Sequence, residues 1–153
     1  MTMLLDVEVD GQAVPQGSMS PFIHHRTGRV VTPQKKSVLA WRDTVAAVAR
    51  ANYRGDPTPD PVRVILAFEL TRPRSHYGTG RNDGQLKPSA PMWCVGRPDL
   101  DKLCRAVLDA LTGVIWCDDS QVVDIDAGKA WSTCAPYTRI EVQSVGALTE
   151  RVG

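Results

Sequence analysis

Two spacings of apolar residues along the chain predict a mixed α+β fold. Alternating or short apolar runs predict four strands, at about residues 3–9, 62–70, 121–130 and 137–145. Apolar residues at three- and four-residue spacing predict two amphipathic helices, one reaching about Tyr53 and one from Leu100 to Leu111. The order strand, helix, strand, helix, strand, strand is typical of one mixed sheet packed with two main helices.

Local start and stop signals bound the predicted helices. Thr32 followed by Pro33 predicts the start of the first helix, with Thr as the N-cap. Pro98 precedes the second helix, and Gly113 ends it. The segment between the first strand and the first helix is rich in Pro, Gly and Ser, which predicts a loop with a small hairpin around Thr27-Gly28.

Length and composition fit one domain over residues 1–153. A chain of 153 residues can bury a normal core, and its 42% hydrophobic and 23% charged content is ordinary. No signal peptide and no membrane-spanning apolar run is recognisable, so we expect no membrane partner. The four cysteines have no C-x-x-C spacing and no His at zinc-ligand distance, which argues against zinc and favours free thiols in a reducing cytoplasm.

Charge is unevenly distributed although the formal net charge is only +1. Residues 24–50 are basic with a single acid, Asp43, whereas residues 99–126 hold seven aspartates against Lys102 and Arg105. One surface for a polyanion and another for a cation would explain this asymmetry. Ordinary surface variation explains it equally well.

A long segment at residues 72–98 shows almost no periodicity and is basic. A structureless loop of this length is usually functional or disordered. We interpret it as an arm that contacts phosphates, with Tyr77 and Trp93 as aromatic faces; the alternative is a solvated linker. The candidate DNA-contacting residues over the whole chain are Arg26, Arg29, Lys35, Lys36, Arg72, Arg74, Lys87, Arg97 and Lys102.

Two pairs of aspartates flank the second helix. Asp99 and Asp101 lie where it begins, and Asp118 and Asp119 precede the next strand. Taken separately, the first pair fits helix capping and the second fits turn formation. The helix and the following strand are sequence neighbours, however, and packing them together can bring Asp119 near Asp99 and Asp101. Such an all-oxygen site suits Mg²⁺ or Mn²⁺ and phosphoryl-transfer chemistry.

Arg105 lies four residues after Asp101 and therefore projects from the same helical face. This position predicts contact with a scissile phosphate or with developing negative charge. The alternative is an ion pair with Asp101 or Asp109 within the helix. Lys102 points to a different face, where it contacts either phosphate or water.

The segment "RPDLDKLCRAVLDALTG" followed by "DDSQVV" resembles the RusA-type Holliday junction resolvases, crossover junction endodeoxyribonucleases of which many are encoded by phages and prophages. Residues 14–45 resemble the family more weakly. The resemblance implies a RusA-like fold, with Asp99, Asp101 and Asp119 as metal-binding catalytic acids and Asp118 in support. The family typically has Lys where this chain has Arg105, which keeps a phosphate-binding role, and commonly Asn in place of Lys102.

From the motifs and this resemblance we expect a Mg²⁺-dependent endonuclease, with Mn²⁺ able to substitute, that resolves Holliday junctions by paired symmetric nicks in DNA recombination and repair. Two symmetric cuts imply a C₂ homodimer acting in the cytoplasm, that of a bacterial host if the protein is phage-encoded. One alternative is a less selective nuclease for flaps or forks in phage DNA processing. Another is a non-catalytic DNA-binding module whose aspartates only cap and turn.

Overall fold

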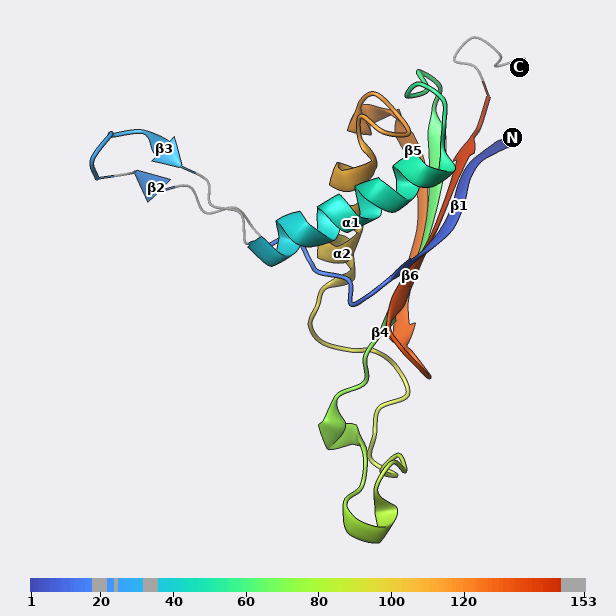
Figure 1. Ribbon diagram of the computed structural model, residues 1–153. Helices are drawn as coiled ribbons and strands as arrows, with labels where there is room; N and C mark the ends of the chain where they lie inside the picture. Colours follow the sequence, from blue (N-terminus) through green and yellow to red (C-terminus); the bar gives the residue numbers. More distant parts are fainter. Residues whose placement is uncertain (18–21, 24, 32–35, 147–153) are drawn as a thin grey trace.

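The computed structural model describes residues 1–17, 22–23, 25–31 and 36–146, which fold around a four-stranded sheet (Figure 1). The strands are β1 (Thr2–Asp10), β4 (Val62–Leu70), β5 (Val122–Trp131) and β6 (Tyr137–Ser144). Their order in the sheet is β1-β6-β4-β5. Strands β4 and β5 are parallel, and the other two pairings are antiparallel. The predicted α+β class and the positions of these strands are confirmed.

Two helices, α1 (Lys36–Asn52) and α2 (Leu100–Leu111), cover the same face of the sheet (Figure 1). The core lies between them and β4, which buries every second residue from Val62 to Leu70, as its alternation predicted. Helix α2 ends where predicted, because Gly113 adopts a left-handed φ of +82° directly after the C-cap Thr112. The predicted start of the first helix, Thr32-Pro33, lies outside the described residues. No described helix has both the length and the apolar character needed to span a membrane.

The opposite face of the sheet is polar and carries ion pairs between strands. The Arg139 guanidinium lies 3.3 Å from the Asp6 carboxylate on β1 and 3.0 Å from the Glu141 carboxylate. One covered face and one solvated face are typical of antiparallel pairings such as β1 with β6. The two helices and the apolar core therefore lie on one side of the sheet, and these charged side chains lie on the other.

Two segments extend from this body. The predicted hairpin is present as β2 (Phe22–Ile23) paired with β3 (Val30–Val31), with Gly28 at a φ of +63° in the turn. Residues 72–98, which we call the arm, leave the end of β4, extend beyond the sheet and return to α2 (Figure 1). The arm contains two short 3₁₀ helices, η1 (Arg74–His76) and η2 (Gly80–Asn82), which the sequence did not predict.

The base of the arm is held against the last residue of β5. The Arg72 guanidinium lies 5.3 Å from the centroid of the Trp131 ring, and its Nη1 donates to the carbonyl of Pro91 at 2.8 Å. The His76 ring meets Trp131 edge-on, with centroids 5.3 Å apart. These contacts join the outgoing and returning segments of the arm to each other and to Trp131. The base of the arm is therefore fixed to the sheet.

Candidate active site

A groove of about 710 Å³ runs between α2 and β5. Asp101, Arg105 and Asp109 line it because they are spaced by four residues and project from one strip of the helix. From the other side it is lined by Asp119 and by Ile125 and Ala127 of β5. The remaining lining residues are Leu100, Cys104 and Leu108. The predicted packing of the helix against the following strand therefore brings Asp101, Arg105 and Asp119 into one groove.

The turn before β5 separates the roles of the two adjacent aspartates. Asp118 is the N-cap of the 3₁₀ helix η3 (Asp119–Gln121), and its carboxylate accepts the backbone N–H of Ser120 at 2.9 Å. Hydrogen bonds from the side chain and backbone of Ser120 hold the pKa of the Asp118 carboxyl below its usual value. Asp118 thus performs the turn-forming role that was the structural alternative, whereas its neighbour Asp119 lines the groove.

Gln121 fixes this turn to the rest of the fold, a role that was not predicted from the sequence. Its Oε1 accepts the backbone N–H groups of Cys117 and Asp118, both at 2.8 Å. Its Nε2 donates to the carbonyls of Thr58 and Asp60, at 2.7 and 2.9 Å, in the segment before β4. The available signal was the capping-box spacing, an Asp followed three residues later by Gln.

Asp119 itself is contacted by two donors that were not predicted from the sequence either. The Thr112 hydroxyl donates to Asp119 Oδ1, and Trp116 Nε1 lies 3.4 Å from the same oxygen. Trp116 is fully buried. A buried indole N–H needs a hydrogen-bond acceptor. The Trp in the short apolar segment before the aspartates was therefore the sequence signal for this contact.

The two acids at the start of α2 differ in their surroundings. Asp99 occupies the N-cap position, but its side chain makes no capping hydrogen bond, so the predicted structural alternative does not apply to it. It lines a neighbouring hollow of about 490 Å³ with Arg97 and Lys102, not the groove itself. The Asp101 carboxylate lies 3.4 Å from the Lys102 ammonium and remains exposed.

Lys129 of β5 holds the chain just before these acids. Its ammonium donates to the carbonyls of Gly96 and Pro98, at 2.6 and 2.7 Å. In the parallel register, residue 129 lies opposite the buried Phe68, so it belongs to the strand face that meets α2. A Lys among otherwise apolar inward positions of a strand was the signal for this anchor.

Arg105 is exposed on the groove wall. In the part of the chain that the structure describes, it forms no ion pair with Asp101 or Asp109, which was its structural alternative. The adjacent Cys104 thiol also lines the groove. Burial raises the pKa of this thiol, and the negative charge of Asp101 raises it further. Arg105 is therefore the cationic side chain of this groove, and Cys104 remains a neutral thiol there.

Comparison with known proteins shows which family the chain belongs to. Residues 12–143 match the family model described as "Endodeoxyribonuclease RusA". The chain belongs to the RusA endodeoxyribonuclease family. It is also similar to the Uncharacterized protein YqaN of Bacillus subtilis (strain 168), with 28% identity over 144 residues, 91% of this chain and 95% of that protein.

The family match confirms the predicted resemblance and the predicted enzyme class, an endodeoxyribonuclease acting on DNA. RusA nucleases generally depend on divalent metal ions. Both aspartate pairs and the whole arm lie inside the matched range. The α2–β5 groove is therefore the candidate active site of a RusA-family nuclease.

The acids of this RusA-family groove supply only oxygen ligands. Mg²⁺ is commonly held by one or two carboxylates together with waters and substrate phosphates, so Asp101 and Asp119 match its donor preference. Among the described residues, no three Asp, Glu, His or Cys side chains are grouped closely enough to hold a metal ion. The residues fit an ion that is shared with a DNA phosphate better than an ion enclosed by protein alone.

The predicted DNA-contacting residues are distributed over the arm, the hairpin and the helix starts. Arg26, Arg29, Lys36, Lys87 and Arg97 are exposed. Lys35 lies outside the described residues. Arg72 is half-buried at the base of the arm, and Lys102 is paired with Asp101.

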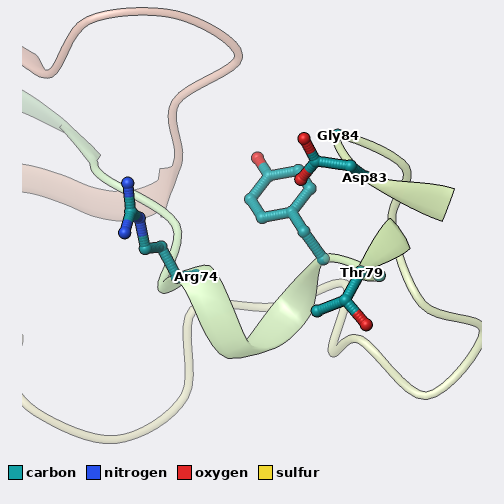
Figure 2. A pocket seen from close by; sticks show the side chains of 6 residues that line it. Arg74, Thr79, Asp83 and Gly84 are labelled. Atoms are coloured by element: carbon teal, nitrogen blue, oxygen red, sulfur yellow. The ribbon is translucent and has the colours of Figure 1, made fainter. Parts of the chain in front are cut away.

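Arg74 lies on the arm beside a separate hollow of about 470 Å³. Figure 2 shows Arg74 on one side of this hollow and Asp83 and Gly84 on the other. Because Arg74 is exposed, it differs from Arg72 two positions earlier, whose guanidinium is already engaged by Pro91 and Trp131.

Proposed function

We propose that this RusA-family nuclease is a Mg²⁺-dependent endonuclease that resolves Holliday junctions by paired symmetric nicks, with Mn²⁺ able to replace Mg²⁺. The single observation that carries the proposal is that Asp101, Asp119 and Arg105 line one groove between α2 and β5. Two carboxylates and one guanidinium in an open groove suit the hydrolysis of a phosphodiester. We assign this activity to DNA recombination and repair in the cytoplasm. For a phage-encoded protein, this is the cytoplasm of the bacterial host.

Each groove residue has a role in this chemistry. Asp101 and Asp119 would bind the metal ion from the groove, and Asp99 would be the third ligand, from the neighbouring hollow. A bound ion supplies a Lewis acid for the phosphate and makes a bound water more acidic. Hydrolysis adds the water oxygen to phosphorus and breaks one backbone P–O bond. Arg105 would contact the phosphate oxygens that gain negative charge as this bond breaks.

Substrate binding is assigned to the exposed basic residues outside the groove. Arg74, Lys87 and Arg97 lie on the arm, which extends beyond the sheet (Figure 1). Arg26 and Arg29 lie on the β2–β3 hairpin. Phosphate contacts from both the arm and the hairpin would position a branched DNA over the groove. Such contacts do not depend on the DNA sequence.

A homodimer follows from the symmetry of the substrate. A four-way junction has approximate two-fold symmetry and is resolved by two symmetric cuts. The described residues of one chain place Asp101, Arg105 and Asp119 together in one groove. A C₂ pair presents two grooves related by the same symmetry. Ile23 and Val30 of the hairpin are 66% and 70% exposed, which makes them candidates for the contact between the two copies.

The deciding experiment incubates the purified protein with a synthetic four-way junction, a fork, a flap and a linear duplex, each with Mg²⁺, Mn²⁺ or EDTA. The proposal predicts metal-dependent nicks at symmetric positions in two opposite strands of the junction, with little cutting of the other substrates. Equal cutting of forks or flaps would make the protein a less selective structure-specific nuclease. Junction binding without cutting in either metal would make it a DNA-binding module.

A further inference from the structure

Oxygen Oδ1 of Asp119 is engaged by two side chains from the segment between α2 and η3. The Thr112 hydroxyl donates to it, and Trp116 Nε1 approaches it at 3.4 Å. Trp116 Nε1 also donates to the Thr112 hydroxyl oxygen at 3.1 Å. Within the described residues, Asp119 Oδ2 has no hydrogen-bond partner. One carboxylate oxygen is therefore held by the protein, and the other is available.

The proton count supports donation from Thr112 to Asp119. A hydroxyl carries one proton and accepts at its lone pairs. The Thr112 hydroxyl also lies 2.9 Å from the carbonyl of Leu108, which accepts the backbone N–H of Thr112 at 3.0 Å as well, so this carbonyl and the Asp119 carboxylate compete for one hydroxyl proton. A carboxylate is a stronger acceptor than a neutral carbonyl, so it takes the hydroxyl proton. Trp116 donates to the hydroxyl oxygen. The three groups form a directed chain from indole to hydroxyl to carboxylate.

Both donors are rigidly placed. Trp116 is 0% exposed, and its carbonyl accepts the backbone N–H of Gly113 at 2.7 Å. The preceding residue, Ile115, accepts the backbone N–H of Thr58 at 2.8 Å. Thr112 is the C-cap of α2. An exposed Asp on a surface turn would otherwise sample several rotamers, so donors fixed by the core limit the directions that its carboxylate can take.

We propose that Thr112 and Trp116 are positioning residues that hold Oδ1 of Asp119 so that Oδ2 is presented to the metal ion. This inference rests on the proposed role of Asp119 as a metal ligand. Outer partners of this kind fix the orientation of a ligand, and their loss typically costs about 10- to 100-fold in metal affinity or activity.

The test compares Thr112→Val, which removes only the hydroxyl from a similar shape, with Thr112→Ser, which retains it. The matched control is Thr44→Val, because the Thr44 hydroxyl is on a helix but donates to the carbonyl of Ala40, at 2.9 Å, and does not line the groove. Trp116→Phe removes the indole N–H. Its control is Trp41→Phe, because Trp41 is also buried but its Nε1 has no partner in the described chain.

Two readouts are independent of DNA cleavage. Mn²⁺ binding is measured by the electron paramagnetic resonance of the free ion, and the four indole N–H signals are followed by ¹H–¹⁵N NMR. Thr112→Val should weaken Mn²⁺ binding by about 10-fold or more, and Thr112→Ser should restore most of it. The Trp116 signal, identified by its absence in Trp116→Phe, should shift in Thr112→Val and on addition of Mg²⁺. Both control variants should bind Mn²⁺ like the parent.

The outcomes for Asp119→Asn separate this inference from the proposed function. If Asp119→Asn binds Mn²⁺ like the parent, the metal site itself is wrongly assigned. If Asp119→Asn loses Mn²⁺ binding but a folded Thr112→Val binds within about twofold of the parent, only the positioning role is overturned. A positioning role also predicts that Thr112→Val adds little to the loss in the Asp119→Asn background.

Discussion

Asp101 and Asp119 line the same groove, although one lies in the first turn of α2 and the other begins the turn before β5. Two other side chains fix this arrangement by hydrogen bonds to carbonyls that are distant in the sequence. Gln121 ties the turn of Asp119 to the segment before β4, and Lys129 ties the start of α2 to β5. The geometry of the groove is therefore expected to depend on residues that contribute no charge to its wall.

Replacing Gln121 with Ala should loosen the turn that carries Asp119. The change removes the partners of two exposed N–H groups and of two half-buried carbonyls. We expect a loss of about 1–3 kcal/mol in the free energy of unfolding, with cleavage reduced further than stability explains. Urea titration and junction nicking measure the two effects. Gln143→Ala is the control, because Gln143 is half-buried on β6 and makes no side-chain hydrogen bond in the described chain.

Lys129→Met should release the chain just before Asp99 from β5. The variant lacks two charge-assisted hydrogen bonds to carbonyls, and water can replace part of them because Lys129 is half-exposed. We expect roughly 1–2 kcal/mol of destabilisation, measured by urea titration, together with slower cleavage. Lys87→Met, which removes an exposed ammonium on the arm, should leave the free energy of unfolding nearly unchanged. Equal stability of the two variants would contradict the anchoring role of Lys129.

The elements around the groove were predictable because periodicity reports burial. The alternation from Val62 to Leu70 is enough to identify the buried face of β4, and the apolar stripe of α2 with Gly113 after it is enough to bound that helix. The sheet order, with β6 between β1 and β4, is a long-range pairing that no local spacing encodes. The 3₁₀ helices of the arm are short and have no buried residues, so they produce no periodic signal.

The sequence predicted which types of residue form the site, but it did not predict the residues that hold them in place. Aspartates at a helix start and before the next strand predict that these carboxylates lie near one another. Asp101 and Asp119 do line the same groove. Asp99 lies in the neighbouring hollow because its direction depends on the local geometry of the first turn of α2. Gln121 and Lys129 act by hydrogen bonds to carbonyls that are far away in the sequence. A single Gln or Lys gives only a weak sequence signal for such a contact.

Arg105 should contribute to turnover more than to substrate binding. If its guanidinium contacts the phosphate that reacts, Arg105→Ala should lower the cleavage rate by about 100-fold, whereas Arg105→Lys should retain much of the activity. Single-turnover cleavage and junction affinity in EDTA separate the two effects. An Ala variant that cuts at the parental rate would leave Arg105 as an exposed helix residue without a catalytic role.

Junction binding should weaken steeply with salt if the arm binds phosphates. Arg74→Ala and Arg97→Ala each remove one cation from the arm, and each should flatten the log–log dependence of affinity on salt by about 0.9. Arg54→Ala is the control, because Arg54 is exposed in the loop before β4, at the other end of that strand from the arm. Unchanged slopes for Arg74→Ala and Arg97→Ala would remove the arm from the DNA interface.

The three predicted metal-binding acids should act as a unit. Asp99→Asn, Asp101→Asn and Asp119→Asn should each remove most of the cleavage, and combining two should cost little beyond one. All three variants should retain the parental melting temperature within a few degrees, because these carboxylates are exposed. If Asp99→Asn alone retains full cleavage, the ion is held by the two groove acids without it.

The most direct test compares Asp119→Asn with Asp118→Asn in Mg²⁺-dependent nicking of a synthetic four-way junction. Asn forms the same turns as Asp and caps helices equally well, but it lacks the charge that holds a hard divalent cation. Because Asp118 caps η3 while Asp119 lines the groove, Asp118→Asn should cut near the parental rate. Asp119→Asn should fold and bind the junction in EDTA, yet lose cleavage. An Asp119→Asn variant that nicks the junction as fast as the parent would contradict the assignment of this groove as the active site.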